Sequence, residues 1–176
     1  MKVTLLKWIT GDDWIGIRQR ALVTVGKASD TAPSENWKTR ILAARHSPIR
    51  YGMFSFLIED VPYYVSVHLV RHHEGFQPYI RSQRNDRQSE YVRNSARQDA
   101  PVSMILDINA EAMMNIANKR LCGKADPATR ALVQAMCDAV LQRNPEFKPF
   151  LTPACVYHGG VCHEMAPCGN GGASCE

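Results

Sequence analysis

The segment from Asp126 to Pro145 has the clearest periodicity in the chain and limits the possible folds most. Apolar residues recur there at every third or fourth position, which is the pattern of one buried helix face. Asp126 is a favourable N-cap, Pro127 suits the first helical turn, and Asn144-Pro145 ends the pattern. We interpret the stripe as core rather than a cofactor-binding surface; its residues are Ala128, Ala131, Leu132, Ala135, Met136, Ala139 and Val140.

A strand followed by a helix is predicted between residues 51 and 72. Phe54 and Phe56 flank a serine, which is the period-two pattern of a strand with one apolar face. A bend should follow at Glu59-Asp60, and Pro62 suits the first turn of the next helix. Helical spacing gives one face of that helix Tyr64, Val67, His68 and Arg71, so His68, Arg71 and His72 should lie at one end.

The remaining segments complete an α+β pattern. We expect an opening strand over residues 1–9, a helix over 13–25, a second helix that Ser34 caps and Pro48 stops, and a helix over 112–121. Residues 102–108 predict either a strand or the lead-in to a helix. Residues 75–101 are polar and arginine-rich, and we interpret them as a long functional loop with little regular structure.

Composition indicates one ordinary globular domain. The chain has 176 residues, of which 45% are hydrophobic and 22% charged, enough to bury one sizeable core. Its apolar runs stop well short of the roughly 18 to 20 residues that span a bilayer. Met1-Lys2 is followed by no signal-peptide pattern. We therefore expect a cytoplasmic protein without a membrane partner.

Arginines are concentrated in one segment, although the net charge of the chain is only +4. Six arginines and three acids lie between Arg71 and Arg97. Such a run is either a solvated face or an anion-binding site. Arginine forks suit phosphate groups, so the choice depends on the motifs around the run.

The order of several short motifs resembles the core of flavin-dependent thymidylate synthases over roughly residues 35–150. That family has a histidine-proline turn, a Phe-x-Phe strand, a proline that opens a helix, an Arg-His-Arg signature and a later Ser-x-Arg. A second block has an arginine, an alanine five residues later and a polar or basic residue ten later. The corresponding residues here are His46-Ser47-Pro48, Phe54-Ser55-Phe56, Pro62, Arg71-His72-His73, Ser82 with Arg84, and Arg120 with Ala125 and Arg130.

The resemblance implies a fold and an activity. The fold would be a flavin-dependent thymidylate synthase-like α+β domain over residues 1–150, with an antiparallel or mixed sheet and packed helices, in a homotetramer whose active sites form between subunits. The activity would be methylene transfer from methylenetetrahydrofolate to dUMP, with FAD recharged by NADPH and no protein nucleophile. The implied FAD contacts are His46, Arg71, His72 and His73, and the implied contacts with the pyrimidine deoxynucleotide are His68, Ser82, Arg84 and Arg120.

Two positions depart from the family pattern. His73 stands where the family has arginine, which replaces a permanent cation by a titratable one, and Ile80 stands where the family has glutamate. These departures support an alternative hypothesis, a catalytically divergent nucleotide- or nucleic-acid-binding protein on the same fold. A zinc-dependent nucleic-acid protein is a third hypothesis, which rests only on the tail and the positive charge.

Residues 151–176 form a cysteine-rich tail outside the resemblance. Soft ligands in a loop-rich stretch with few apolar residues favour a structural zinc site, and reduced, unliganded cysteines are the alternative. The candidate ligands are Cys155, Cys162, Cys168 and Cys175; because Cys175 is next to the end of the chain, Cys122, His158 or His163 is an alternative fourth ligand.

Overall fold

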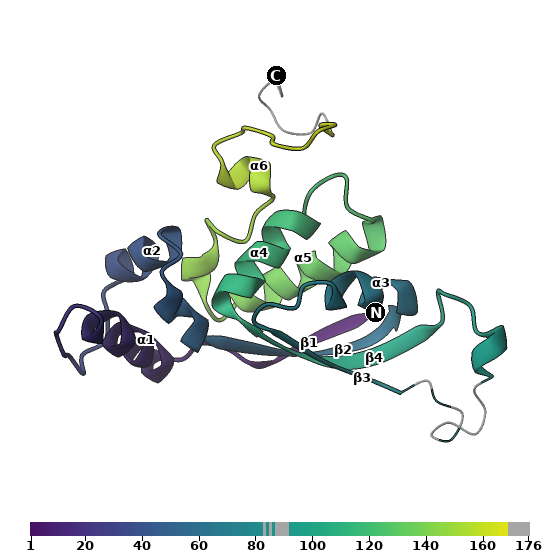
Figure 1. Ribbon diagram of the computed structural model, residues 1–176, viewed down its shortest axis with the longest axis horizontal. Helices are drawn as coiled ribbons and strands as arrows, with labels where there is room; N and C mark the ends of the chain where they lie inside the picture. Colours follow the sequence, from purple (N-terminus) through teal and green to yellow (C-terminus); the bar gives the residue numbers. More distant parts are fainter. Residues whose placement is uncertain (83, 85, 87–91, 169–176) are drawn as a thin grey trace.

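The computed structural model of the protein describes residues 1–82, 84, 86 and 92–168 (Figure 1). Within these ranges, none of the helices combines the length and the hydrophobicity that a transmembrane span requires. The elements are, in chain order, β1 (Lys2–Lys7), α1 (Gly11–Val23), α2 (Glu35–Ala43), η1 (Ser47–Tyr51), β2 (Met53–Pro62), α3 (Tyr63–Val70), β3 (Phe76–Ile80), η2 (Arg93–Ser95), β4 (Pro101–Asn109), α4 (Ala110–Arg120), α5 (Pro127–Leu141), η3 (Pro145–Phe147) and α6 (Ala154–Tyr157).

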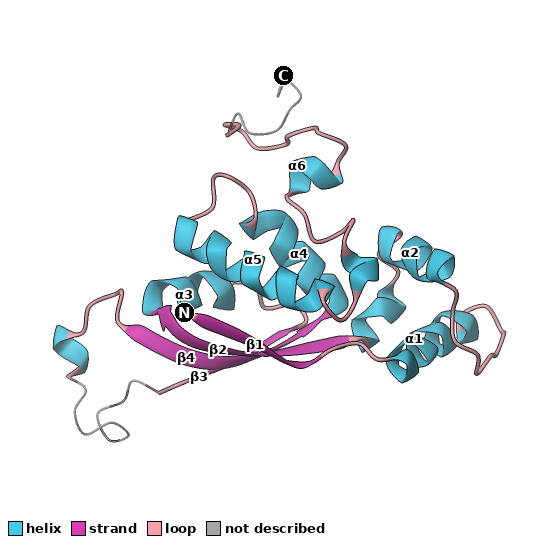
Figure 2. Ribbon diagram, turned by 180° about the vertical axis from the view of Figure 1, so that it is seen from behind, coloured by secondary structure: helices cyan, strands magenta, loops and turns pink. Residues whose placement is uncertain are grey.

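The sheet has four strands in the order β1-β2-β4-β3, and each neighbouring pair is antiparallel. Helices α3, α4 and α5 cover one face of this sheet, while α1 and α2 lie at one end of it (Figure 2). Segment 102–108 belongs to β4 and is therefore a strand. The expectation of an α+β fold is confirmed, and the sheet is antiparallel rather than mixed.

The alternation predicted for β2 places its phenylalanines in the core. Phe54, Phe56 and Ile58 have no exposed surface, and their partners on β4 point to the same side. Phe147 of η3 packs edge-on against Phe54 with ring centroids 5.4 Å apart. Each such side chain contributes roughly 1.5 to 3 kcal/mol through removal from water. The buried side of the central strands is therefore the foundation on which the helices pack.

Helix α5 begins at Pro127, directly after the predicted N-cap Asp126. The Oδ1 of Asp126 accepts a hydrogen bond from Thr129 N at 2.9 Å. Its buried face differs in part from the predicted stripe. Leu132, Met136 and Val140 are buried as expected, but Ala131 is exposed. Helix α5 packs on β1, α4 and α3. Its buried face therefore includes Thr129, Val133 and Cys137, which are not in the predicted stripe.

The interpretation of residues 75–101 as a loop with little regular structure is wrong for its first part. Phe76–Ile80 forms the edge strand β3, which pairs with β4 from Ile108 to Met104. Pro78 conceals this strand in the sequence, because proline argues against a strand except at positions such as the edge of a sheet, where β3 lies.

The predicted bend at Glu59-Asp60 is a bulge inside β2 rather than the end of the strand. Asp60 has a φ of 55°, and the register with β4 shifts between Ile58 and Val61. The strand continues to Pro62, which caps α3 instead of lying in its first turn. A bulge of this kind changes the direction of the strand without ending its pairing.

Two helix predictions need smaller corrections. Helix α1 begins at Gly11 rather than Asp13, because Thr10 and Asp13 form a reciprocal capping box. The predicted face of α3 is not its buried face: Val65, Ser66 and Leu69 are buried, whereas Val67 is 40% exposed. Tyr64 and His68 are half-buried because that side of α3 lies next to α5.

Gly75 allows the turn before β3 to approach the start of α4. Its φ is 65°, and its carbonyl accepts from Asn109 N at 2.9 Å. A Cβ at this position would lie 2.1 Å from Asn109 Nδ2. Asn109 is the N-cap of α4, with its Oδ1 accepting from Ala112 N at 2.9 Å. The turn and the helix start therefore depend on each other.

We expect Gly75→Ala to destabilise the protein by about 2 to 3 kcal/mol, the sum of left-handed strain and disturbance of the α4 cap. Gly26→Ala is the matched control, because Gly26 has a φ of 69° and nothing within 4 Å of an added Cβ. It should cost only the strain, about 1 to 2 kcal/mol. Urea denaturation of both variants measures the difference. Equal losses would show that contact with Asn109 imposes no constraint.

Candidate functional site

The C-terminal ends of α3 and α4 meet through Arg120. Its Nε donates to His72 Nε2 at 2.9 Å, and its Nη2 donates to the carbonyl of His68 at 3.2 Å. Because a guanidinium has no acceptor, His72 Nε2 must be unprotonated, and the ring is a neutral Nδ1–H tautomer. Burial, and next the charge of Arg120, lower the pKa of His72 in agreement with this assignment.

Several cations gather at this junction. Burial, followed by the charge of Arg71, lowers the pKa of Arg120, and Lys119 adjoins it on α4. The last turn of a helix presents unpaired carbonyl groups that stabilise nearby positive charge. The two helix ends thus offset part of the repulsion between the cations.

Hydrogen bonds hold the ring of His68 at the start of α5. Its Nδ1 lies 2.9 Å from Thr129 Oγ1, and that hydroxyl donates to Asp126 Oδ1 at 3.0 Å. The hydroxyl hydrogen is therefore directed to Asp126, so His68 Nδ1 is the donor to Thr129. Hydrogen bonds from the Thr129 backbone, opposed by burial and aided by its hydroxyl, lower the pKa of Asp126. This series of hydrogen bonds orients His68 and stabilises the start of α5.

Two adjoining pockets lie beside the junction. A pocket of about 200 Å³, here called the Arg71 pocket, is lined by Arg71, His72, His73, Glu74, Ala112, Asn115 and Ile116. A pocket of about 490 Å³, here called the Arg120 pocket, is lined by His72, Asn115, Lys119, Arg120, Cys122, Lys124, Ala125 and Glu164. His72 and Asn115 belong to both, so the pockets share a wall.

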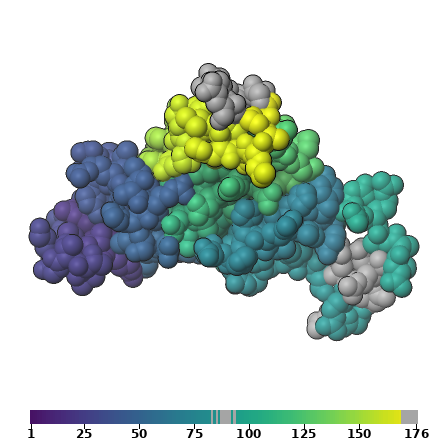
Figure 3. Space-filling view, turned by 45° about the horizontal axis from the view of Figure 1, so that its top comes forward, coloured from purple at the N-terminus to yellow at the C-terminus, as the bar shows by residue number. Residues whose placement is uncertain are grey.

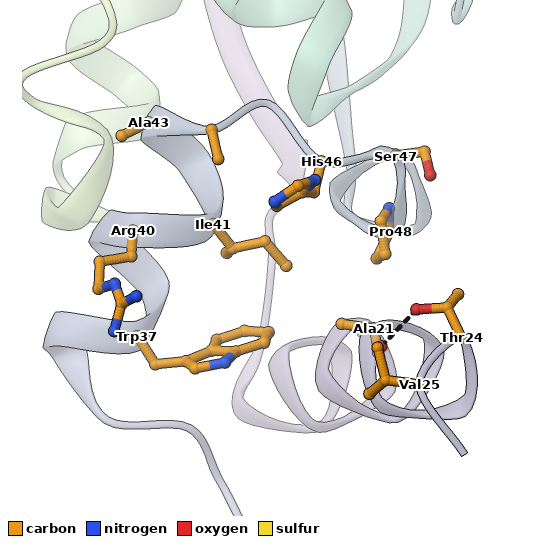
Figure 4. A pocket seen from close by; sticks show the side chains of 11 residues that line it. Ala21, Thr24, Val25, Trp37, Arg40, Ile41, Ala43, His46, Ser47 and Pro48 are labelled. Carbon is orange, nitrogen blue, oxygen red and sulfur yellow. Dashed lines mark hydrogen bonds between the residues drawn. The ribbon is translucent and has the colours of Figure 1, made fainter. Parts of the chain in front are cut away.

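A third pocket, here called the Trp37 pocket, has a volume of about 650 Å³ and lies between α1, α2 and η1 (Figure 4). The side chains of Trp37, Ile41 and Pro48 give it apolar walls, and those of Arg40 and His46 add polar groups at its border. Mostly apolar walls with a few polar groups are typical of sites for planar organic ligands and cofactors.

The end of α2 positions His46 at this pocket. The chain leaves the helix in a Schellman arrangement: Arg45 N donates to the Leu42 carbonyl at 3.1 Å, and His46 N donates to the Ile41 carbonyl at 3.4 Å. Arg45 has a φ of 49°, a conformation that usually selects glycine.

Contacts of the Arg45 side chain oppose the strain of this backbone conformation. Its guanidinium donates to Asn115 Oδ1 and Asn118 Oδ1 and lies 4.8 Å from the Tyr157 ring centroid. Arg45 thus connects the Trp37 pocket to the helix that carries Asn115.

The structure groups some of the predicted site residues and separates others. Arg71, His72 and His73 line one pocket, and Arg120 reaches His72. His46 lies in the Trp37 pocket, and His68 is on none of the three pocket walls. Ser82 and Arg84 are also outside these walls; Arg84 makes paired hydrogen bonds with Asp86.

Sequence reasoning missed five polar residues of the Arg71 and Arg120 pockets. Glu74 follows α3, Glu164 comes from the tail, and the other three, on or after α4, are Asn115, Lys119 and Lys124. No short motif marks them, because residues distant in sequence meet at these walls only after folding. Helical spacing offers one weak signal, since Asn115 and Lys119 are one turn apart.

The tail shows no metal centre within its described residues. In the described ranges, no three histidine, cysteine, aspartate or glutamate residues are close enough to hold an ion. Cys155, Cys162 and Cys168 are half-exposed free thiols, and Cys175 lies outside the described residues. The rings of His158 and His163 pack edge-on, 5.1 Å apart. The zinc site therefore stays a prediction without support from these residues.

Comparisons with known proteins establish the fold. Neither a protein-family model nor a curated protein sequence matches the chain. A crystal structure of flavin-dependent thymidylate synthase ThyX from Helicobacter pylori, complexed with FAD and dUMP, is similar with a TM-score of 0.68 and 14% identity, covering 86% of this chain and 100% of that one. A second H. pylori ThyX structure with FAD and dUMP has a TM-score of 0.67 and 15% identity, covering 90% and 100%.

The UMP/dUMP methylase PolB from Streptomyces cacaoi, bound with 5-Br dUMP, is also similar. Its TM-score is 0.65 at 15% identity, over 85% of this chain and 95% of that one. At such low identity these likenesses show that the chain has a ThyX-like fold. The fold that the motif order predicts is therefore confirmed.

The neutral state of His72 gives a testable pH dependence. Its pKa is lowered in the folded protein, so between that value and the ordinary pKa of about 6.5 the unfolded chain binds more protons. The free energy of unfolding therefore rises with pH in this window. His72→Gln keeps an oxygen that accepts from Arg120 and should remove this contribution.

Chemical denaturation of the wild type and His72→Gln at several pH values measures this contribution. The wild type should lose stability relative to the variant as pH falls below about 6.5, with a constant difference above neutrality. A difference that stays constant over the whole range would contradict the assignment.

Proposed function

We propose that the protein is a flavin-dependent enzyme that transfers a one-carbon unit to a deoxyuridine monophosphate, with methylenetetrahydrofolate and NADPH as co-substrates. The observation that carries the proposal is the Arg120 junction, where a ThyX-like fold gathers cations next to a pocket of nucleotide size. The similar ThyX structures contain FAD and dUMP, and PolB contains 5-Br dUMP.

The residues of two pockets fit FAD. The Trp37 pocket offers an indole, an imidazole and aliphatic walls, which suit an extended aromatic ring system. The Arg71 pocket offers a guanidinium and two imidazoles, which suit a pyrophosphate. His46 would hold the cofactor in the first, and Arg71, His72 and His73 in the second. When bound, the flavin supplies the hydride and the carrier chemistry that side chains lack.

The Arg120 pocket fits the phosphate of a nucleotide. Lys119, Arg120 and Lys124 bring three cations to one wall, and Asn115 adds an amide that both donates and accepts. In this proposal the chain itself binds, orients and neutralises the phosphate, and no side chain acts as a nucleophile. His72 keeps the guanidinium of Arg120 in place by accepting from its Nε.

The proposal includes a homotetramer, which the motif resemblance implies. Ser82 and Arg84 lie outside the three pockets of their own chain, beyond the end of β3. In an assembly with active sites between subunits, they would contact the nucleotide of a neighbouring chain. His68 then supports the site from α3 through Thr129 rather than by direct contact.

The first test is flavin binding. We expect the purified protein to show the visible absorbance of a flavin, or to bind added FAD. His46→Ala should weaken FAD binding about 5-fold, as loss of one polar or stacking contact of about 1 kcal/mol predicts. His163→Ala is the matched control, because His163 packs on His158 outside all three pockets. Absence of flavin together with failure to bind FAD would rule out the flavin-dependent enzyme.

The second test is nucleotide binding, measured by calorimetry with dUMP. Arg120→Ala should weaken binding at least about 10-fold, because charge-assisted hydrogen bonds to phosphate contribute roughly 1.5 to 3 kcal/mol. Arg143→Ala is the control: Arg143 lies outside the pocket wall, with its guanidinium carbon 4.6 Å from the centroid of the Trp8 ring. Undiminished binding in a folded Arg120→Ala protein would show that the nucleotide site is elsewhere.

A further inference from the structure

The tail is anchored on α4 and reaches the Arg120 pocket from there. Phe150 and Leu151 are buried, and Asn118 Nδ2 donates to the carbonyls of Phe150 at 3.2 Å and Thr152 at 2.6 Å. The Tyr157 ring lies against Arg45. In Figure 3 the tail, drawn in yellow, covers part of the green surface of the helices. Segment 150–157 thus fixes the path along which Glu164 arrives at the pocket.

Glu164 adds a negative charge to the Arg120 pocket, which also carries positive charges. Among the described residues that line this pocket it is the one acid, and the others include Lys119, Arg120 and Lys124. Within the described part of the chain, no ion pair of 4.0 Å or less joins Glu164 to these cations. Glu164 is also exposed to solvent. The carboxylate and the cations therefore line one pocket without neutralising each other, and both remain available to a ligand.

Such a pocket selects ligands with two different ends. The cations attract an anionic group, whereas an ionised carboxylate only accepts hydrogen bonds and repels anions. A ligand that matches both walls carries a phosphate at one end and an N–H donor at the other. A nucleoside monophosphate with an N–H on its base has this form, and a sugar phosphate without a base does not.

We infer that Glu164 is a specificity-determining residue of the Arg120 pocket, which accepts a hydrogen bond from an N–H of the nucleotide base while Lys119, Arg120 and Lys124 hold the phosphate. The inference rests on the proposed function, and it makes the cysteine-rich tail a part of the substrate site. Uracil, with its ring N–H, is a base of the required kind. Removal of Glu164 should therefore have opposite effects on nucleotides and on simple phosphates.

Calorimetry on the full chain with dUMP and with 2-deoxyribose 5-phosphate tests this. Glu164→Ala should weaken dUMP binding about 5-fold, the effect of losing one hydrogen bond at a solvent-exposed acceptor. The same variant should bind 2-deoxyribose 5-phosphate about 2-fold or more tightly, because a repelling charge is gone. Glu164→Gln keeps a hydrogen-bond acceptor but loses the charge. It should therefore bind dUMP more tightly than Glu164→Ala does, and it should bind 2-deoxyribose 5-phosphate as tightly as Glu164→Ala does.

Glu35→Ala is the control, since Glu35 is an exposed acid on α2 that pairs with Lys38 outside this pocket. Its affinities for both ligands should equal those of the wild type. If Glu164→Ala binds both ligands more tightly, Glu164 only repels anions and the inference is overturned. Unchanged dUMP affinity also overturns it while leaving the proposed function intact. A wild-type protein that binds no dUMP overturns both.

Discussion

The antiparallel pairing of β2 with β4 is the constraint on which the site depends. Each of these central strands passes directly into a helix: α3 begins at residue 63 and α4 at residue 110. Because the strands run in opposite directions, the two helices start at opposite ends of the sheet and fold back over the same face (Figure 1). Their C-terminal ends therefore approach each other, and Arg120 reaches His68 and His72 for this reason.

This geometry gives the site an uncommon electrostatic basis. Many anion sites use the backbone N–H groups at helix N-termini. Here, helix C-termini surround the junction, and their carbonyl groups stabilise cationic side chains that would otherwise repel each other. At the proposed nucleotide site, the phosphate would therefore be bound by guanidinium and ammonium groups rather than by the backbone. His72 remains neutral because burial and neighbouring cations both disfavour its protonation.

Local signals in the sequence predict the helices and strands well, but they do not predict the contacts between these elements. Asp126 with Pro127 marks the start of α5, Ser34 caps α2, and Phe54 with Phe56 marks the buried face of β2. Strand β3 is missed because it contains Pro78, a residue that strands tolerate at a sheet edge but that is otherwise typical of loops. The motif order predicts the fold and the group Arg71-His72-His73. It gives no sign that Glu164 joins Lys119 and Lys124, because that wall exists only once the tail folds onto α4.

The edges of the sheet bear on how copies of this chain can associate. β3 contains Pro78, which has no N–H to offer a further strand, and β1 has an irregular register between Leu5 and Lys7 with lysines at both of its ends. Proline, bulges and lysine at edge strands are features that oppose edge-to-edge pairing and aggregation. The sheet is thus protected against growth by strand addition, and an ordered assembly of this protein has to form through its faces, helices or loops.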